Sequence, residues 1–150
     1  MDFHLADKTA LVTGSYRGTG FAIAETLLAE GAKVLVHGLD AEQAAAAVAE
    51  LGAGIPVHGD ISHEAGCQTL LDACANHSVQ ILINNYGGAD PSTWLDSSSA
   101  DWHSAFEKNV LSAQRITQGL LPALLASPWA RIINLGTCLL YTSPSPRDLH

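Results

Sequence analysis

Basic residues are scarce in this sequence. Seven lysines and arginines stand against 15 aspartates and glutamates, which gives a net charge of −8 at pH 7. Proteins that bind nucleic acid neutralise its phosphates with clustered Lys and Arg, so this composition excludes that class of function. An acidic protein can still bind an anionic small molecule where backbone N–H groups supply the positive potential.

The sequence also contains no unbroken hydrophobic run of membrane-spanning length. The longest apolar stretch with helical spacing, residues 110–126, is broken by Gln114, Arg115, Gln118 and Pro122. A bilayer-crossing helix needs about 20 apolar residues, so we expect no membrane span. The first eight residues carry acids where a secretory signal has basic residues. We therefore expect a cytoplasmic location.

Cysteine is too rare, and too poorly spaced, for a disulfide framework. The three cysteines form no Cys-x-x-Cys pair. Cys67 and Cys74 share one predicted helix face with Leu70 and Leu71, so we interpret both as packing residues. His63 lies one helical turn from Cys67, but no third ligand is near, and the other histidines are isolated. We expect no metal site.

What is present is a regular alternation of short apolar runs with amphipathic stretches. The predicted strands are residues 9–13, 33–37, 55–58, 79–83 and 131–135. Four helices are predicted. The first is residues 21–30, the second begins at a cap formed by Asp40 and Gln43, and the third begins at a cap formed by Ser62. The fourth is long and begins at about Asp101; the residues on its apolar face are Phe106, Val110, Ala113, Thr117, Leu120 and Leu124. This order favours a single α/β domain with a doubly wound parallel sheet and right-handed crossovers. Pro56 favours a sheet edge for the third strand.

The most informative segment is residues 13–20, Thr-Gly-Ser-Tyr-Arg-Gly-Thr-Gly, between the first strand and the first helix. Gly14 permits a tight turn off the strand, Gly18 a close approach of backbone to a pyrophosphate, and Gly20 close packing of the helix. The N-terminus of a helix offers N–H groups and a favourable dipole to phosphates. An ordinary glycine-rich turn is the alternative, which the position after a buried strand disfavours.

The spacing Thr-Gly-x3-Gly-x-Gly resembles the short-chain dehydrogenase/reductase family. Further matches follow in order: Asp60-Ile61 after the third strand, Asn84-Asn85-Tyr86-Gly87 against the family's Asn-Asn-Ala-Gly, Asn109 in the long helix, and residues 131–137 running to the catalytic serine position. The resemblance covers residues 3–137 and implies a Rossmann-type doubly wound sheet, truncated after the fifth strand.

The resemblance implies a set of site residues. Among them, the Gly14 loop, Gly38, Asp60, Asn85 and Thr137 each follow a different strand at the same edge of the sheet, where open α/β sheets bind ligands. The expected cofactor-binding residues are Thr13, Gly14, Ser15, Tyr16, Arg17, Gly18, Thr19, Gly20, Gly38, Asp60, Ile61, Asn85, Tyr86 and Gly87. The expected catalytic residues are Asn109, supporting a proton-relay water, and Thr137, replacing the family's serine with an equivalent hydroxyl. Tyr86 departs from the family's small residue and is expected beside the nicotinamide pocket, unless it only packs locally.

Charge favours NADP(H) over NAD(H) as the cofactor. A carboxylate at the end of the second strand would hold the ribose 2′-hydroxyl of NAD, but Gly38 occupies that position, followed by Leu39. Arg17 matches a position that the family uses for the 2′-phosphate. Asp40 is the counter-evidence, although it is expected to cap a helix.

The family's catalytic Tyr-x-x-x-Lys has no match in this chain. Residues 138–148 instead resemble the read-through translation of a transposon-type sequencing adapter; a natural Pro/Ser-rich loop is the alternative. We expect residues 1–137 to be an incomplete dinucleotide-binding domain and residues 138–150 a non-native tail, so that this chain is inactive.

The expected function of the intact parent is NAD(P)-dependent reduction of a carbonyl or oxidation of an alcohol by hydride transfer. The expected partner is a small-molecule carbonyl or alcohol substrate, and the intact parent is expected to be a homodimer or homotetramer. A non-catalytic dinucleotide-binding module is the alternative. An epimerase or dehydratase on the same fold is less favoured, because those relatives more often show Thr-Gly-x2-Gly-x2-Gly.

Overall fold

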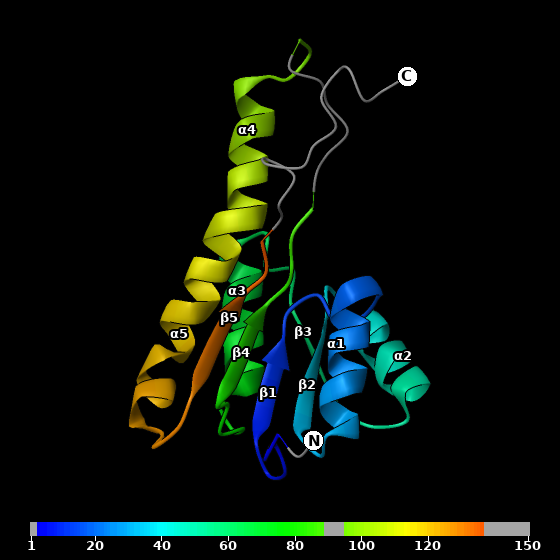
Figure 1. The fold of residues 1–150 in the computed structure, drawn as a ribbon. Coiled ribbons are helices and arrows are strands. Elements are labelled where there is room, and N and C mark those ends of the chain that lie inside the picture. Colours follow the sequence, from blue (N-terminus) through cyan, green and yellow to red (C-terminus); the bar gives the residue numbers. More distant parts are fainter. Residues whose placement is uncertain (1–2, 89–94, 137–150) are drawn as a thin grey trace, which may run out of the picture.

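A computed structural model describes residues 3–88 and 95–136 (Figure 1). Its centre is a five-stranded, fully parallel sheet with the strand order β3-β2-β1-β4-β5. The strands are β1 (Thr9–Val12), β2 (Lys33–Gly38), β3 (Ile55–His58), β4 (Ile81–Asn84) and β5 (Arg131–Asn134). The predicted parallel sheet is confirmed, and β3 with its proline forms one edge.

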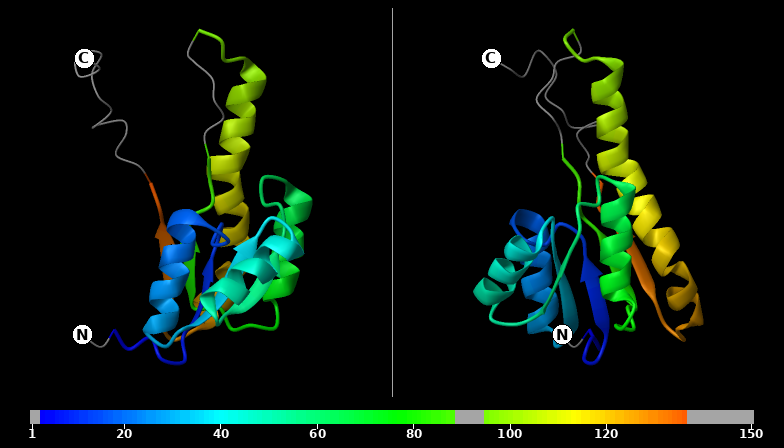
Figure 2. Two further views of the ribbon diagram at one scale, coloured as in Figure 1. Left: turned by 90° about the vertical axis from the view of Figure 1, so that its right-hand side faces the viewer. Right: turned by 180° about the vertical axis from the view of Figure 1, so that it is seen from behind.

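Helices cover both faces of this sheet, as predicted. They are α1 (Gly18–Ala29), α2 (Ala41–Leu51), α3 (Glu64–Cys74), α4 (Ser99–Phe106), the π-helical turn η1 (Glu107–Leu111) and α5 (Ser112–Ala126). α1 and α2 lie on one face, and α3 and α5 on the other (Figures 1 and 2). Within residues 3–88 and 95–136, no helix combines the length and the apolar character needed to cross a bilayer.

The core divides into two layers because successive side chains of a strand point to opposite faces. Leu11 of β1 packs with α3 and α5, whereas Ala10 and Val12 pack toward α1 and α2. All four residues of β1 are buried, as expected for a parallel strand covered on both faces. Cys67 and Cys74 belong to the α3 layer, so their predicted packing role is confirmed. Burial raises the pKa of the Cys74 thiol to about 12.

Two predicted helix caps have different outcomes. The Asp40 cap is confirmed, because its Oδ1 accepts a hydrogen bond from the Gln43 N–H at 2.8 Å. The Ser62 cap is wrong. His63 occupies the N-cap of α3 without a side-chain cap bond. The Ser62 hydroxyl instead donates to Asp60 Oδ1 at 2.6 Å, because that carboxylate lies within reach two residues earlier.

The long helix differs from its prediction in two ways. It begins at Ser99, where Ser98 and Asp101 form a capping box, and it contains the π-helical turn η1. Phe106 and Val110 were expected on the buried face but are 54% and 46% exposed. The buried side chains are Ser112, Ile116, Leu120 and Leu124. The wider turn changes the register of the apolar face, and α4 extends past the carboxyl edge of the sheet (Figure 2).

Candidate functional site

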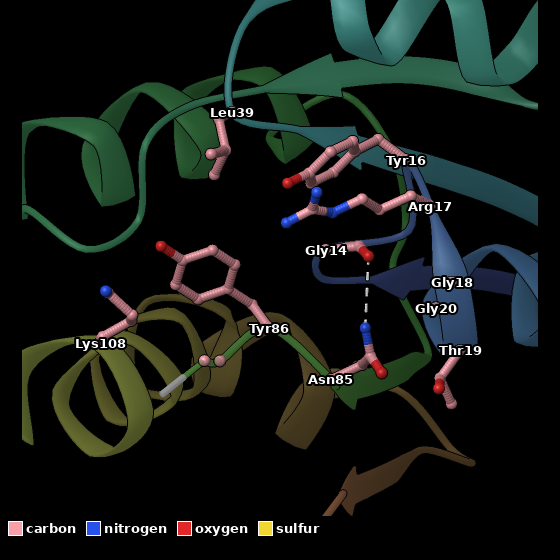
Figure 3. A pocket seen from close by; sticks show the side chains of 12 residues that line it. Gly14, Tyr16, Arg17, Gly18, Thr19, Gly20, Leu39, Asn85, Tyr86 and Lys108 are labelled. Atoms are coloured by element: carbon pink, nitrogen blue, oxygen red, sulfur yellow. Dashed lines mark hydrogen bonds between the residues drawn. The ribbon is translucent and has the colours of Figure 1, made fainter. Parts of the chain in front are cut away.

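A groove of about 560 Å³ opens at the carboxyl edge of the sheet, where ligands bind in open α/β folds (Figure 3). It lies between the loops that follow β1, β2 and β4 and the η1 turn. The residues that line it are Gly14, Tyr16, Arg17, Gly18, Thr19, Gly20, Leu39, Asn85, Tyr86, Gly87, Gly88 and Lys108. The structure thus brings together most of the cofactor-binding residues expected from the sequence.

The glycine-rich turn forms one wall of the groove. Gly14 and Gly18 have φ angles of +65° and +58°, a region that L side chains rarely adopt. A Cβ on Gly18 would meet no atom within 4 Å, so this backbone stands open to a ligand. A Cβ on Gly20 would lie 2.5 Å from both the Gly14 oxygen and Asn85 Nδ2, so only glycine fits there.

The N-terminus of α1 faces this turn. α1 begins at Gly18, three residues before the predicted start at Phe21, and its N-cap residue Arg17 makes no side-chain cap bond. The first N–H groups of a helix have no intrahelical acceptor, and the helix dipole adds positive potential there. This end of α1 can therefore donate hydrogen bonds to an anion in the groove.

The loops after β1 and β4 are joined by Thr13 and Asn85. Thr13 Oγ1 accepts hydrogen bonds from the N–H groups of Asn85 and Tyr86, both at 3.0 Å. Asn85 Nδ2 donates to the Thr13 backbone oxygen at 2.9 Å and to the Gly14 backbone oxygen at 3.3 Å. Figure 3 shows the bond to Gly14. Thr13 is buried and does not line the groove, so it holds the site from behind.

The end of β2 presents no carboxylate to the groove. A Cβ on Gly38 would lie 2.6 Å from the Ala44 backbone nitrogen, so α2 packs too close for an acidic side chain there. The Asp40 carboxylate is engaged in capping α2. Arg17 extends into the groove, with its guanidinium carbon 5.1 Å from the centre of the Tyr16 ring (Figure 3). The charged side chains that line the groove, Arg17 and Lys108, are both basic.

Tyr86 points toward the ends of β2 and β3. Its ring lies 6.4 Å from that of His37 in an edge-to-face arrangement, and Figure 3 shows its hydroxyl between Leu39 and Lys108. Burial raises the pKa of the Tyr86 hydroxyl, and the nearby Asp60 charge adds to that effect. Tyr86 lines the groove, and its expected position beside the nicotinamide stays a prediction.

The remaining expected residues lie around the groove rather than in its lining. Ile61 is a core residue, and Asp60 is exposed, with its side chain bonded to Ser62. Partial burial alone would raise the pKa of Asp60, but the hydrogen bonds from Ser62 and the charges of His63 and His37 lower it. Thr137 lies outside the described residues.

Sequence reasoning missed several residues of the site. Leu39, Gly88 and Lys108 line the groove without belonging to a glycine or asparagine motif position. His37 was interpreted as isolated, yet it contacts the glycine-rich turn. Of these residues, only Leu39 could have been identified from the sequence, because it directly follows the second predicted strand.

Comparison with known proteins gives the family. A family model described as short chain dehydrogenase matches residues 8–139. This chain belongs to the short chain dehydrogenase family. D-beta-hydroxybutyrate dehydrogenase of Cupriavidus necator is 37% identical over 139 residues, which cover 89% of this chain and 54% of that protein.

Two solved structures share the fold. L-sorbose reductase from Gluconobacter frateurii, in complex with NADPH and L-sorbose, has a TM-score of 0.83 and 28% identity, over 89% of this chain and 54% of that one. A 3-oxoacyl (acyl-carrier-protein) reductase from Agrobacterium tumefaciens, with NADP bound, has a TM-score of 0.84 and 31% identity, over 94% of this chain and 57% of that one. The chain spans about half the length of the curated relatives that it matches.

Proposed function

We propose that this chain is the dinucleotide-binding part of an NADP(H)-dependent oxidoreductase. The observation that carries this proposal is the opening of α1 onto the groove: a turn with two positive-φ glycines leads into a helix N-terminus without a side-chain cap. That arrangement offers backbone N–H groups to a pyrophosphate and leaves space where it would approach. A net negative protein can thus bind an anionic cofactor through local backbone dipoles.

The preference for NADP(H) over NAD(H) rests on the adenosine end of the groove. In this fold the residue at the end of β2 contacts the ribose, and a carboxylate there favours NAD. Gly38 cannot be exchanged for an acid without displacing α2, and Arg17 is placed to pair with a 2′-phosphate. The NADPH and NADP bound in the two similar structures support this assignment.

For the intact parent we propose reduction of a small carbonyl compound or oxidation of an alcohol, in a homodimer or homotetramer. NADP(H), when bound, supplies or accepts the hydride. Asn109 would help to place a proton-relay water and Thr137 would orient the substrate oxygen. We further propose that residues 138–150 are foreign to the fold and that a Tyr-x-x-x-Lys segment follows Thr137 in the natural gene.

Binding can be tested directly on this chain. We expect NADPH to bind to the 150-residue protein, as measured by enhancement of its fluorescence, with a lower dissociation constant than NADH. 2′,5′-ADP should compete with NADPH, and 5′-AMP should compete much less well. Equal dissociation constants for NADPH and NADH would contradict the proposed NADP(H) preference. If neither dinucleotide binds, the proposed function is contradicted.

Activity requires the natural gene. Sequencing genomic DNA beyond the Thr137 codon should reveal a Tyr-x-x-x-Lys segment, and the protein so encoded should oxidise NADPH in the presence of a carbonyl compound. This chain should show no turnover, because loss of a general acid alone typically lowers the rate by about 10²- to 10⁴-fold. A natural gene that encodes residues 138–150 and then stops would contradict the proposal that these residues are foreign to the fold. It would favour a non-catalytic dinucleotide-binding module.

A further inference from the structure

One residue, His37 on β2, contacts three consecutive residues of the glycine-rich turn. The Gly14 N–H donates to His37 Nδ1 at 2.8 Å, and the His37 N–H donates to Ser15 Oγ at 2.8 Å. The Tyr16 N–H donates to the His37 backbone oxygen at 3.1 Å. The turn is therefore tied to the neighbouring strand by the backbone and the side chain of the same residue.

The two ring contacts of His37 define its tautomer. Nε2 lies 2.8 Å from the Gly59 backbone oxygen, which can only accept a hydrogen bond, so the proton is on Nε2. Nδ1 is then unprotonated and accepts from the Gly14 N–H. The side chain is fully buried, and burial lowers the pKa of His37 to about 4. The ring is neutral at pH 7, as these two partners require.

His37 links three loops at the carboxyl edge of the sheet. The ring bonds to Gly14 after β1 and to Gly59 after β3, and its edge meets the Tyr86 ring after β4. The Gly14 N–H is directed into β2, so it is not a donor to a ligand. The backbone N–H groups that remain available to a ligand are those of the first turn of α1, which begins at Gly18. Their direction depends on how residues 14–16 are held.

We propose that His37 positions the glycine-rich turn for the dinucleotide pyrophosphate, as a neutral imidazole whose Nδ1 accepts the Gly14 amide. This inference rests on the proposed dinucleotide binding. His37 does not line the groove, so it acts through the turn. An apolar side chain of similar size would fill the core but leave a buried amide without an acceptor, which is costly.

Substitution of His37 by Asn or Gln tests its two ring hydrogen bonds one at a time. Asn places its Oδ1 where His37 has Nδ1, and so preserves an acceptor for Gly14. Gln reaches the position of Nε2 and preserves a donor for Gly59. Leu preserves neither. The exposed neighbour His58 of β3, paired in register with Gly38, provides a control for loss of a histidine at this end of the sheet.

The test is the dissociation constant of NADPH for the 150-residue chain and four variants, with urea unfolding of each. We expect His37→Asn and His58→Asn to stay within about 3-fold of the unmodified chain, and His37→Leu and His37→Gln to bind about 10-fold more weakly or worse, since each leaves the Gly14 amide unpaired. Equal affinities of folded His37→Asn and His37→Leu would overturn the proposal.

The ring itself gives a readout that does not depend on a variant folding. Imidazole ¹⁵N chemical shifts of the unmodified chain should show His37 protonated at Nε2 and unprotonated at Nδ1 at pH 7. The opposite tautomer, or a charged ring, would overturn the proposal. If the unmodified chain binds neither NADPH nor NADH, the proposed function fails and this inference with it. If it binds and the Asn and Leu variants agree, only this inference fails.

Discussion

The side-chain amide of Asn109 holds both backbone groups of Gly88. Its Oδ1 accepts from the Gly88 N–H at 2.9 Å, and its Nδ2 donates to the Gly88 oxygen at 2.8 Å and to the Ala105 oxygen at 2.9 Å. A Cβ on Gly87 would lie 2.6 Å from the same Oδ1. The π-helical turn thus fixes the loop after β4, which forms one wall of the groove.

Removal of this amide should therefore loosen the groove. We expect Asn109→Ala to lower the free energy of unfolding by about 1 kcal/mol, because the lost hydrogen bonds are largely exposed, and to weaken NADPH binding several-fold. Gln114→Ala removes an exposed side-chain amide from α5, which continues the same long helix, and should leave NADPH binding unchanged. Titration of NADPH into both variants checks this expectation, and equal effects would contradict it.

Arg17 should determine the choice between the two dinucleotides. We expect Arg17→Ala to raise the dissociation constant of NADPH by about 10- to 100-fold, the loss of a charge-assisted hydrogen bond, and that of NADH by much less. Arg131 is a matched control, because its guanidinium also lies over an aromatic ring, 4.7 Å from the centre of Trp129. Arg131→Ala should affect neither cofactor. A parallel loss of NADPH and NADH binding in Arg17→Ala would argue against the assignment.

Gly18 should be required for binding rather than for folding. Its Cβ would meet nothing within 4 Å, and the same holds for Gly52 at the end of α2, where φ is +70°. Alanine at either position should cost about 1–2 kcal/mol of stability, because both backbones are left-handed. Only Gly18→Ala should abolish NADPH binding. Unfolding curves and titrations of the pair test this, and unchanged affinity in Gly18→Ala would reduce the motif to a turn.

Stability should decrease in mild acid because of His37. In the folded chain the pKa of His37 is lowered to about 4, against 6.5 for an ordinary histidine. Between these values the unfolded chain binds a proton that the folded chain does not, so stability falls as pH falls through 6.5 and levels off near 4, a loss of about 3 kcal/mol. Urea unfolding at pH 7 and 4.5 should show most of this loss in the unmodified chain. His37→Asn should show a smaller one, and an equal loss would assign the effect to other groups.

The sequence was sufficient for the sheet and the glycine-rich turn because both depend on local pattern. Buried parallel strands are continuous apolar runs, and Gly14, Gly18 and Gly20 are spaced for one backbone geometry. The role of His37 depends on bonds to residues 22 and 23 positions away, which no local pattern predicts. The Ser62 cap was wrong because α3 begins one residue later than that cap requires, with His63 as its N-cap.

The π-helical turn also makes the length of this segment matter as much as its residues. Deletion of one residue within Glu107–Leu111 would let α4 and α5 join as one continuous α-helix. α5 would stay anchored by its buried face and α4 would keep its direction, because a π-helical turn holds one residue more than an α-helical turn over about the same rotation. The residues of the turn would shift around the helix axis, so Asn109 would lose its bonds to Gly88. A homologue one residue shorter here would fold the same way and yet need a different anchor for the loop after β4, so gaps in an alignment at this turn mark a change of site architecture.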